Sequence, residues 1–212
     1  MKFLRGTFYL LAAFCIFCFA YYRIWFLRQP ERNIPHNNTQ FISPANGKIV
    51  CINAWRNDSM QVTKGGMGLI NVWTKDVDTA GIIISIQMDP ADVHFQRAPL
   101  DAKLIWKKHT KGEFHNAIVM SNDYGIRFEN EHNEMLFETG SKRYKVIQIA
   151  GFLARRIEDY LKPDQEVKQG DVIGLIKLGS QVTIILPSGV NVKAKTGDIV
   201  TDGETVLADV NF

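Results

Sequence analysis

The strongest constraint on the fold comes from an apolar run near the N-terminus, because this run is long enough to cross a lipid bilayer. Residues 8–27 contain one charged side chain, Arg23. A helix of this length, at about 1.5 Å per residue, spans about 30 Å, which matches the hydrocarbon core of a bilayer. Arg23 lies near one end of the run, where a long basic side chain can reach the headgroups. Trp25 and two tyrosines lie beside it, as in an interfacial aromatic belt.

A cleaved signal peptide is the competing interpretation of this run, since Lys2 and Arg5 precede it. The run ends in Tyr-Tyr-Arg-Ile-Trp, and no cleavage site of small residues follows it. We therefore predict an uncleaved membrane anchor over residues 1–29, with its helix at about 8–27. The anchor contains no candidate site residue, so we expect its removal to release the protein from membranes without abolishing the chemistry described below.

Charge and cysteine content limit the partners and the compartment of the chain. Basic residues lie on both sides of the anchor, with a slight excess after it, which favours a cytoplasmic location for the rest of the chain. The net charge of +3 is mild and suits an anionic membrane surface. The chain lacks a basic run with interleaved aromatics, so we expect no nucleic-acid partner. The three cysteines form no disulfide pattern, in line with a reducing compartment.

Beyond the anchor, the sequence changes to a pattern of short β-strands. Residues 30–40 are polar and contain two prolines, and we interpret them as a linker. From residue 41 onward, apolar runs alternate with turn clusters, which is typical of a β-sandwich or barrel. The clearest runs are Lys48–Ile52, Ile82–Met88, Lys103–Trp106, Ala117–Met120, Gly125–Glu129, Met135–Glu138, Tyr144–Ile149, Val172–Leu178 and Val182–Leu186. We predict one mainly β domain over residues 41–212.

A weak internal repeat refines this prediction. The pattern Val-x-x-Gly-x-x-Ile at 167–173 recurs as Val-x-x-Gly-x-x-Val at 200–206. Such turns resemble the hammerhead turns of lipoyl and biotinyl carrier domains, so we expect a barrel-sandwich core with additional antiparallel strands. A carrier function would need a modifiable lysine at the tip of a tight hairpin, and the segment between the two halves offers no convincing one.

The segment Pro-Ala-Asn-Gly at 44–47 also occurs in zinc endopeptidases of the lysostaphin type. Those enzymes bind the metal with a His-x-His pair. The five histidines of this chain include no such pair, so we expect no metal site.

Four blocks together resemble the phosphatidylserine decarboxylase family. They occur in the order of the family, from about residue 41 to about residue 187, and their joint match is far more specific than any single block. The blocks are Ser43–Ile49, Asp89–Pro99, Ala150–Ile157 and Leu178–Gly179–Ser180 with the strand that follows. We identify the chain as a short, membrane-anchored member of this family.

The resemblance implies self-cleavage and a pyruvoyl cofactor. Ser180 Oγ attacks the carbonyl of Gly179, and elimination and hydrolysis then leave residues 1–179 and a chain whose first residue, at 180, is a pyruvoyl group. This group forms a Schiff base with the amine of phosphatidylserine and accepts electrons as CO₂ leaves, as pyridoxal phosphate does elsewhere. The product is phosphatidylethanolamine. We expect the two chains to stay associated, and the family pattern is compatible with a homo-oligomer.

His94 matches the histidine that serves as the base of the family. Asp92, two residues before it, would point to the same face of an extended segment and orient the imidazole. The family usually has Asp in the first block, whereas this chain has Asn46. Asparagine can accept a hydrogen bond from the imidazole but cannot compensate the charge of an imidazolium. The candidate catalytic residues are therefore Ser180, His94, Asp92 and Asn46, and the alternative function is a non-catalytic, membrane-tethered barrel-sandwich binding module.

Overall fold

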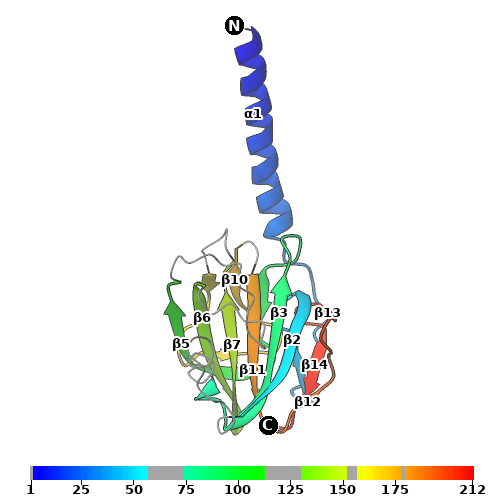
Figure 1. Ribbon diagram of the computed structural model, residues 1–212, viewed down its shortest axis with the longest axis vertical. Coiled ribbons are helices and arrows are strands. Elements are labelled where there is room, and N and C mark those ends of the chain that lie inside the picture. Colours follow the sequence, from blue (N-terminus) through cyan, green and yellow to red (C-terminus); the bar gives the residue numbers. More distant parts are fainter. Residues whose placement is uncertain (1, 57–73, 113–129, 152–156, 178–179) are drawn as a thin grey trace.

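The structure is a computed structural model that describes residues 2–56, 74–112, 130–151, 157–177 and 180–212. It begins with a long apolar helix that projects from a β-domain (Figure 1). The α-helix α1 covers Lys2–Ala20 and continues as a wider π-helical segment, η1, over Tyr21–Phe26. Within it, Arg5–Phe26 is long and apolar enough to cross a membrane by length and composition. The predicted apolar helix is therefore present.

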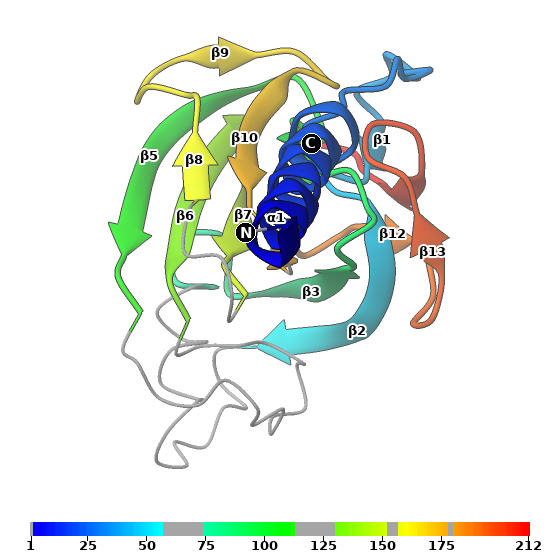
Figure 2. The ribbon, with the colours of Figure 1, turned by 90° about the horizontal axis from the view of Figure 1, so that it is seen from above.

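The β-domain is built on one curled antiparallel sheet of eight strands. Their order is β13-β2-β3-β11-β7-β6-β5-β9, and Figure 2 shows the sheet bending into a half-barrel. The bounds of these strands are β2 Gly47–Arg56, β3 Ala80–Met88, β5 Ala102–Thr110, β6 His132–Thr139, β7 Lys142–Ile149, β9 Glu166–Val167, β11 Ser180–Pro187 and β13 Ile199–Val200. The prediction of a mainly β domain is confirmed.

Two smaller antiparallel sheets lie against the large one. Their orders are β1-β14-β12 and β4-β10-β8. The bounds are β1 Gln40–Ile42, β4 Phe95–Arg97, β8 Ile157–Asp159, β10 Val172–Ile176, β12 Asn191–Val192 and β14 Val206–Asp209. The runs predicted at 117–120 and 125–129 lie outside the described residues.

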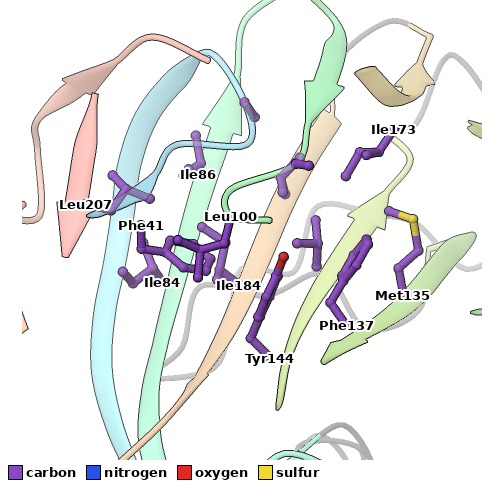
Figure 3. Close-up of a cluster of buried hydrophobic side chains, with 14 of the residues drawn as sticks. Phe41, Ile84, Ile86, Leu100, Met135, Phe137, Tyr144, Ile173, Ile184 and Leu207 are labelled. Atoms are coloured by element: carbon purple, nitrogen blue, oxygen red, sulfur yellow. The ribbon is translucent and has the colours of Figure 1, made fainter. Parts of the chain in front are cut away.

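The main core fills the concave side of the curled sheet. Tyr144 packs edge-on against Phe41 and parallel to Phe137, each with a ring-centroid distance of 5.2 Å (Figure 3). A second buried cluster includes Ile83 and Ile185, which lie next to main-core residues along the same strands. Alternate side chains of a strand point to opposite faces, so β3 and β11 are buried on both faces. Their nearly continuous apolar runs are typical of such strands.

The predicted repeat appears as two equivalent turns. Gly170 and Gly203 both adopt positive φ angles, 91° and 79°. Each donates its main-chain N–H to a carbonyl oxygen at 2.9 Å, on Ala98 for Gly170 and on Ser43 for Gly203. Glycine suits both positions because side chains disfavour this backbone region. The two turns therefore occupy matching places beside two matching segments.

The two partner segments are also bonded to each other in a reciprocal way. The N–H of Arg97 donates to the carbonyl of Pro44 at 2.9 Å, and the N–H of Ile42 donates to the carbonyl of Pro99 at 3.3 Å. Pro44 and Pro99 occupy equivalent positions of the two copies. Such exchange is expected when two copies of a unit pack about a local twofold relationship.

Residues 28–39 contain no regular element, but they are tied to both repeated turns. The Ile34 side chain lies so close to the two glycines that a β-carbon added there would be 2.7 Å from it at Gly170 and 2.8 Å at Gly203. Arg32 forms an ion pair with Asp202 at 2.5 Å. The N–H of Asn37 donates to Gln169 at 2.8 Å. The segment between the anchor and the domain is thus held along the domain surface.

Candidate active site

A tight turn after β3 carries the candidate base. The N–H of Asp92 donates to the carbonyl of Asp89 at 2.9 Å, and the N–H of Asp89 donates to the Asp92 carboxylate at 2.7 Å. Pro90 occupies the second position of this turn, where its fixed φ is favourable. Asp92 therefore lies in a turn and not in the extended segment that the sequence predicted. Its carboxylate closes the turn, and its charge acts on the imidazole of His94.

The imidazole of His94 is fully buried and has a defined tautomer. Its Nδ1 lies 2.9 Å from the main-chain oxygen of Asp92. A carbonyl oxygen can only accept, so in the neutral ring Nδ1 carries the proton and Nε2 carries the lone pair. Among the described residues, Nε2 has no hydrogen-bond partner. The ring therefore presents an unused basic nitrogen.

The electrostatic surroundings keep this ring neutral. Burial lowers the pKa of His94 below its usual value because it removes water from the charged form. The hydrogen bond to the Asp92 carbonyl and the charge of Asp92 oppose this effect, whereas the charge of Arg28 adds to it. A neutral imidazole at pH 7 can accept a proton, as a general base must.

The end of the apolar N-terminal helix covers the same ring. Phe26 is fully buried, and its ring centroid lies 4.2 Å from that of His94, with the two rings tilted by 34°. The Tyr22 ring also stacks on Phe26, with a ring-centroid distance of 5.5 Å. The helix that the sequence predicts as an anchor therefore ends in a residue that contacts the candidate base. An aromatic residue at the end of an apolar run is usually part of an interfacial belt, so no sequence signal distinguishes Phe26 from its neighbours.

Both ends of the segment around residue 179 are attached to the strand and loop that lead to His94. The N–H of Ile176, at the end of β10, donates to the carbonyl of His94 at 3.2 Å. Ser180, at the start of β11, pairs with Met88 at the end of β3. Leu178 and Gly179 lie outside the described residues. The described residues that flank this connection, Ile176 and Ser180, are therefore both bonded to the segment that leads from β3 to His94.

A chain of buried amides fixes the main chain at His94. Gln96 Nε2 donates to the carbonyl of His94 at 2.7 Å, and Gln148 Nε2 donates to Gln96 Oε1 at 2.7 Å. Asn133 extends this chain by donating to Gln148 at 3.0 Å. All three side chains are buried. Sequence analysis missed them, because isolated glutamines in strands carry no motif.

Asn46 lies at the same end of the sheet but binds other partners. Lys48 pairs with Gln87 in β3, so Asn46 and Ser180 flank the end of this strand from opposite sides. Asn46 Oδ1 accepts the N–H of Asp202 at 2.7 Å. The hydrogen bond to His94 that the sequence suggested is not formed.

Asp202 is the centre of a charged cluster next to this position. Its carboxylate is fully buried and pairs with Arg32 at 2.5 Å and Arg97 at 2.8 Å. Arg97, three residues after His94, is therefore engaged with Asp202. Among the described residues, no group of three or more His, Cys, Asp or Glu side chains is arranged to hold a metal ion.

Comparison with known proteins assigns the chain to a family. The family model described as phosphatidylserine decarboxylase matches residues 19–208. A Chlorobaculum parvum phosphatidylserine decarboxylase proenzyme is 34% identical over 192 residues, covering 91% of this chain and 80% of the relative. A Methanocaldococcus jannaschii protein, provisionally named an archaetidylserine decarboxylase proenzyme, is 34% identical over 187 residues, covering 88% of this chain and 89% of the relative. The chain belongs to the phosphatidylserine decarboxylase family of carboxy-lyases.

Proposed function

We propose that this protein is a membrane-anchored proenzyme that cleaves itself between Gly179 and Ser180 and then converts phosphatidylserine to phosphatidylethanolamine. One observation carries the proposal. The buried imidazole of His94 has an Nε2 that finds no hydrogen-bond partner within the described part of the chain, and the loop and strand around it are attached to both sides of the proposed cleavage site. Family membership supplies the reaction class.

Self-cleavage uses groups of this chain and water. His94 Nε2 takes the proton of Ser180 Oγ as the oxygen attacks the Gly179 carbonyl carbon. The C–N bond breaks, the nitrogen of residue 180 takes up a proton, and an ester joins the two residues. Elimination then releases the carboxylate of Gly179 and leaves a dehydroalanine at 180. Water hydrolyses this residue, ammonia leaves, and a pyruvoyl group remains.

The pyruvoyl group would supply an electron sink for decarboxylation. Decarboxylation also requires a nearby base whose lone pair is available. His94 Nε2 fits this role, because no other described residue forms a hydrogen bond with it. His94 can hold a proton at Nε2 and return it to the substrate after CO₂ has left. Asp92 acts through its charge, which favours the protonated ring, while its main-chain oxygen holds Nδ1. Asn46 supports the site indirectly, by holding the main chain of Asp202 in the charged cluster.

We further propose that the cleaved chains remain together. The new C-terminal chain begins with β11, which pairs with β3 from Ser180 to Pro187 and with β7 from Gln181 to Ile185. A central strand held on both sides cannot leave without unfolding the sheet. The reciprocal bonds of the repeated turns also favour a barrel-sandwich core of the lipoyl type.

The membrane arrangement follows from the same elements. The helix of residues 5–26 anchors the chain, and its end lies on the active-site histidine, so lipid substrate would reach the site from the membrane surface. The basic residues after the helix favour a cytoplasmic domain. The headgroup rather than the lipid tail is the proposed point of recognition, because relatives are named for both phosphatidylserine and archaetidylserine.

The decisive experiment compares chain splitting with lipid turnover. The full-length protein, purified in detergent, is analysed by denaturing gel and intact mass, and its release of CO₂ from phosphatidylserine vesicles is measured. We expect a blocked fragment of residues 180–212 and turnover in the wild type, and a single inactive chain in Ser180→Ala and His94→Ala. A wild type that stays uncleaved in the presence of lipid would instead support the non-catalytic, membrane-tethered module that the replacement at Asn46 suggests.

A further inference from the structure

Phe26 differs from the rest of the membrane helix in its surroundings. Along residues 5–26 it is the fully buried side chain, whereas apolar neighbours such as Phe19 and Ile24 are 67% and 75% exposed. An exposed apolar side chain on this helix is available to lipid. Phe26 instead contributes its whole surface to the β-domain, so its role is not that of an anchor residue.

The surface that Phe26 covers is the imidazole of the proposed base. The two ring centroids are 4.2 Å apart, and His94 has no exposed surface. The next residue, Leu27, packs against the apolar cluster of Val93, Phe95 and Leu175, which includes both neighbours of His94 in sequence. The end of the helix therefore forms one wall of the pocket around the ring.

Arg28 links the end of the helix to the turn that precedes His94. Its guanidinium donates to the carbonyl of Trp25 at 2.8 Å and to the carbonyl of Ala91 at 2.6 Å. It also lies over the Trp25 ring at 4.4 Å. A single side chain thus links the last turn of the helix to the Asp89–Asp92 turn.

The charges around His94 come from three directions. Its own loop carries Asp92 and Asp89, and the helix end contributes Arg28. On the side of β10, Lys177 is paired with Glu158 at 2.5 Å. A substitution that removes the Phe26 ring leaves these charges in place. A change in the pKa of His94 in such a variant therefore reflects the exposure of its ring to water.

We propose that Phe26 is a positioning residue for His94, and that the docked end of the membrane anchor is thereby a working part of the active site. The proposal rests on the proposed role of His94 as the base. Phe26 keeps water from the imidazole and holds the ring in the orientation fixed by the Asp92 carbonyl. Membrane attachment and proton transfer then depend on the same segment.

The test measures the imidazole directly. Full-length Ser180→Ala protein, which stays a single chain, is placed in phospholipid nanodiscs, and the His94 ring is titrated by NMR after assignment with His94→Gln. The same titration is made with Phe26→Ala, with Phe26→Leu, and with Phe19→Ala as the matched control that loses a lipid-exposed phenyl. We expect the titration midpoint to rise in Phe26→Ala, to rise less in Phe26→Leu, and to stay unchanged in the control.

A parallel series with Ser180 intact follows self-cleavage against pH. In Phe26→Ala the acid limb of the rate profile should move to higher pH, and the rate on the plateau should fall by about tenfold through loss of orientation. A parental midpoint in Phe26→Ala, or in Phe26→Leu if the alanine variant fails to fold, would overturn the proposal. If the midpoint shifts but the wild type never cleaves, the positioning contact stands and the proposed function fails.

Discussion

Asn46 accepts the main-chain N–H of Asp202 at 2.7 Å, and this bond joins the loop before β2 to the turn before β14. The Asp202 carboxylate in turn holds Arg32, which belongs to the segment after the membrane helix. Asn46 therefore acts in a cluster that ties three distant parts of the chain together. A direct interaction with His94 is not needed to explain an amide at this position.

The first prediction concerns this bond. Asn46→Ala should lower the free energy of unfolding by about 1 kcal/mol, the usual value of one hydrogen bond, and slow self-cleavage by about fivefold or less. Asn46→Asp should behave like the parent, since a carboxylate also accepts the Asp202 N–H. Urea unfolding and time courses of chain splitting measure both effects. Loss of all cleavage in Asn46→Ala at unchanged stability would show that Asn46 contacts the reacting atoms.

The second prediction concerns the carboxylate of Asp202. Asp202→Ala would leave Arg32 and Arg97 without their shared, fully buried partner. Breaking such a buried pair typically costs about 3–5 kcal/mol. Asp209→Ala is the matched control, because the Asp209 side chain is 44% exposed where it pairs with Lys193. An exposed pair contributes at most about 1 kcal/mol, so equal losses in the two variants would contradict the structural role of Asp202.

Individual strands and turns of the fold were predictable, because local sequence patterns determine them. The alternating run of Val182, Ile184 and Leu186 predicts a buried strand, and β11 occupies the centre of the large sheet. The spacing around Gly170 and Gly203 predicts a repeat, because both positions need positive φ. The curl of the sheet and its strand order depend on contacts between segments far apart in sequence, and no local pattern carries them.

The site was predictable only in part for the same reason. His94 is recognised through its motif, but no local pattern shows that Asp92 lies in a turn in which its carboxylate accepts the N–H of Asp89. Gln96 supports His94 through a buried hydrogen bond to its carbonyl, and Phe26 supports it through a ring contact from a distant segment. Such contributions appear only when the chain is folded.

The third prediction tests how tightly the segment after the anchor is held. Gly170→Ala places a β-carbon 2.7 Å from Ile34 at a φ of 91°, whereas Gly189→Ala has a φ of 88° and meets no atom within 4 Å. Backbone strain should lower the free energy of unfolding of both variants by about 1–2 kcal/mol, and the contact with Ile34 should lower that of Gly170→Ala further. The excess should disappear when Ile34→Ala is combined with Gly170→Ala in a double-mutant cycle. An excess that persists would mean that Ile34 does not occupy this place in solution.

The fourth prediction concerns pH. Burial lowers the pKa of His94 in the folded protein below its ordinary value of 6.5. As the pH falls through 6.5, the unfolded chain therefore binds a proton that the folded chain does not, and the protein loses stability until the folded pKa is reached. Unfolding of Ser180→Ala at a series of pH values should show this loss. Adding His94→Gln should remove that part of the pH dependence, and an unchanged slope would contradict the burial of a neutral ring.

The last prediction separates two roles of the membrane helix. A chain without residues 1–19 keeps η1, the Phe26 ring and Arg28, whereas a chain without residues 1–27 loses the cover of His94. Both chains should leave the membrane fraction, because each lacks most of the apolar span. The shorter deletion should still cleave itself at nearly the parental rate. The longer deletion should be less stable, by the few kcal/mol typical of losing a buried phenyl, and should cleave at least about tenfold more slowly. Sedimentation, urea unfolding and chain splitting measure the three effects. If both deletions cleave equally well, the helix serves only for attachment and the contact between Phe26 and His94 has no part in the chemistry.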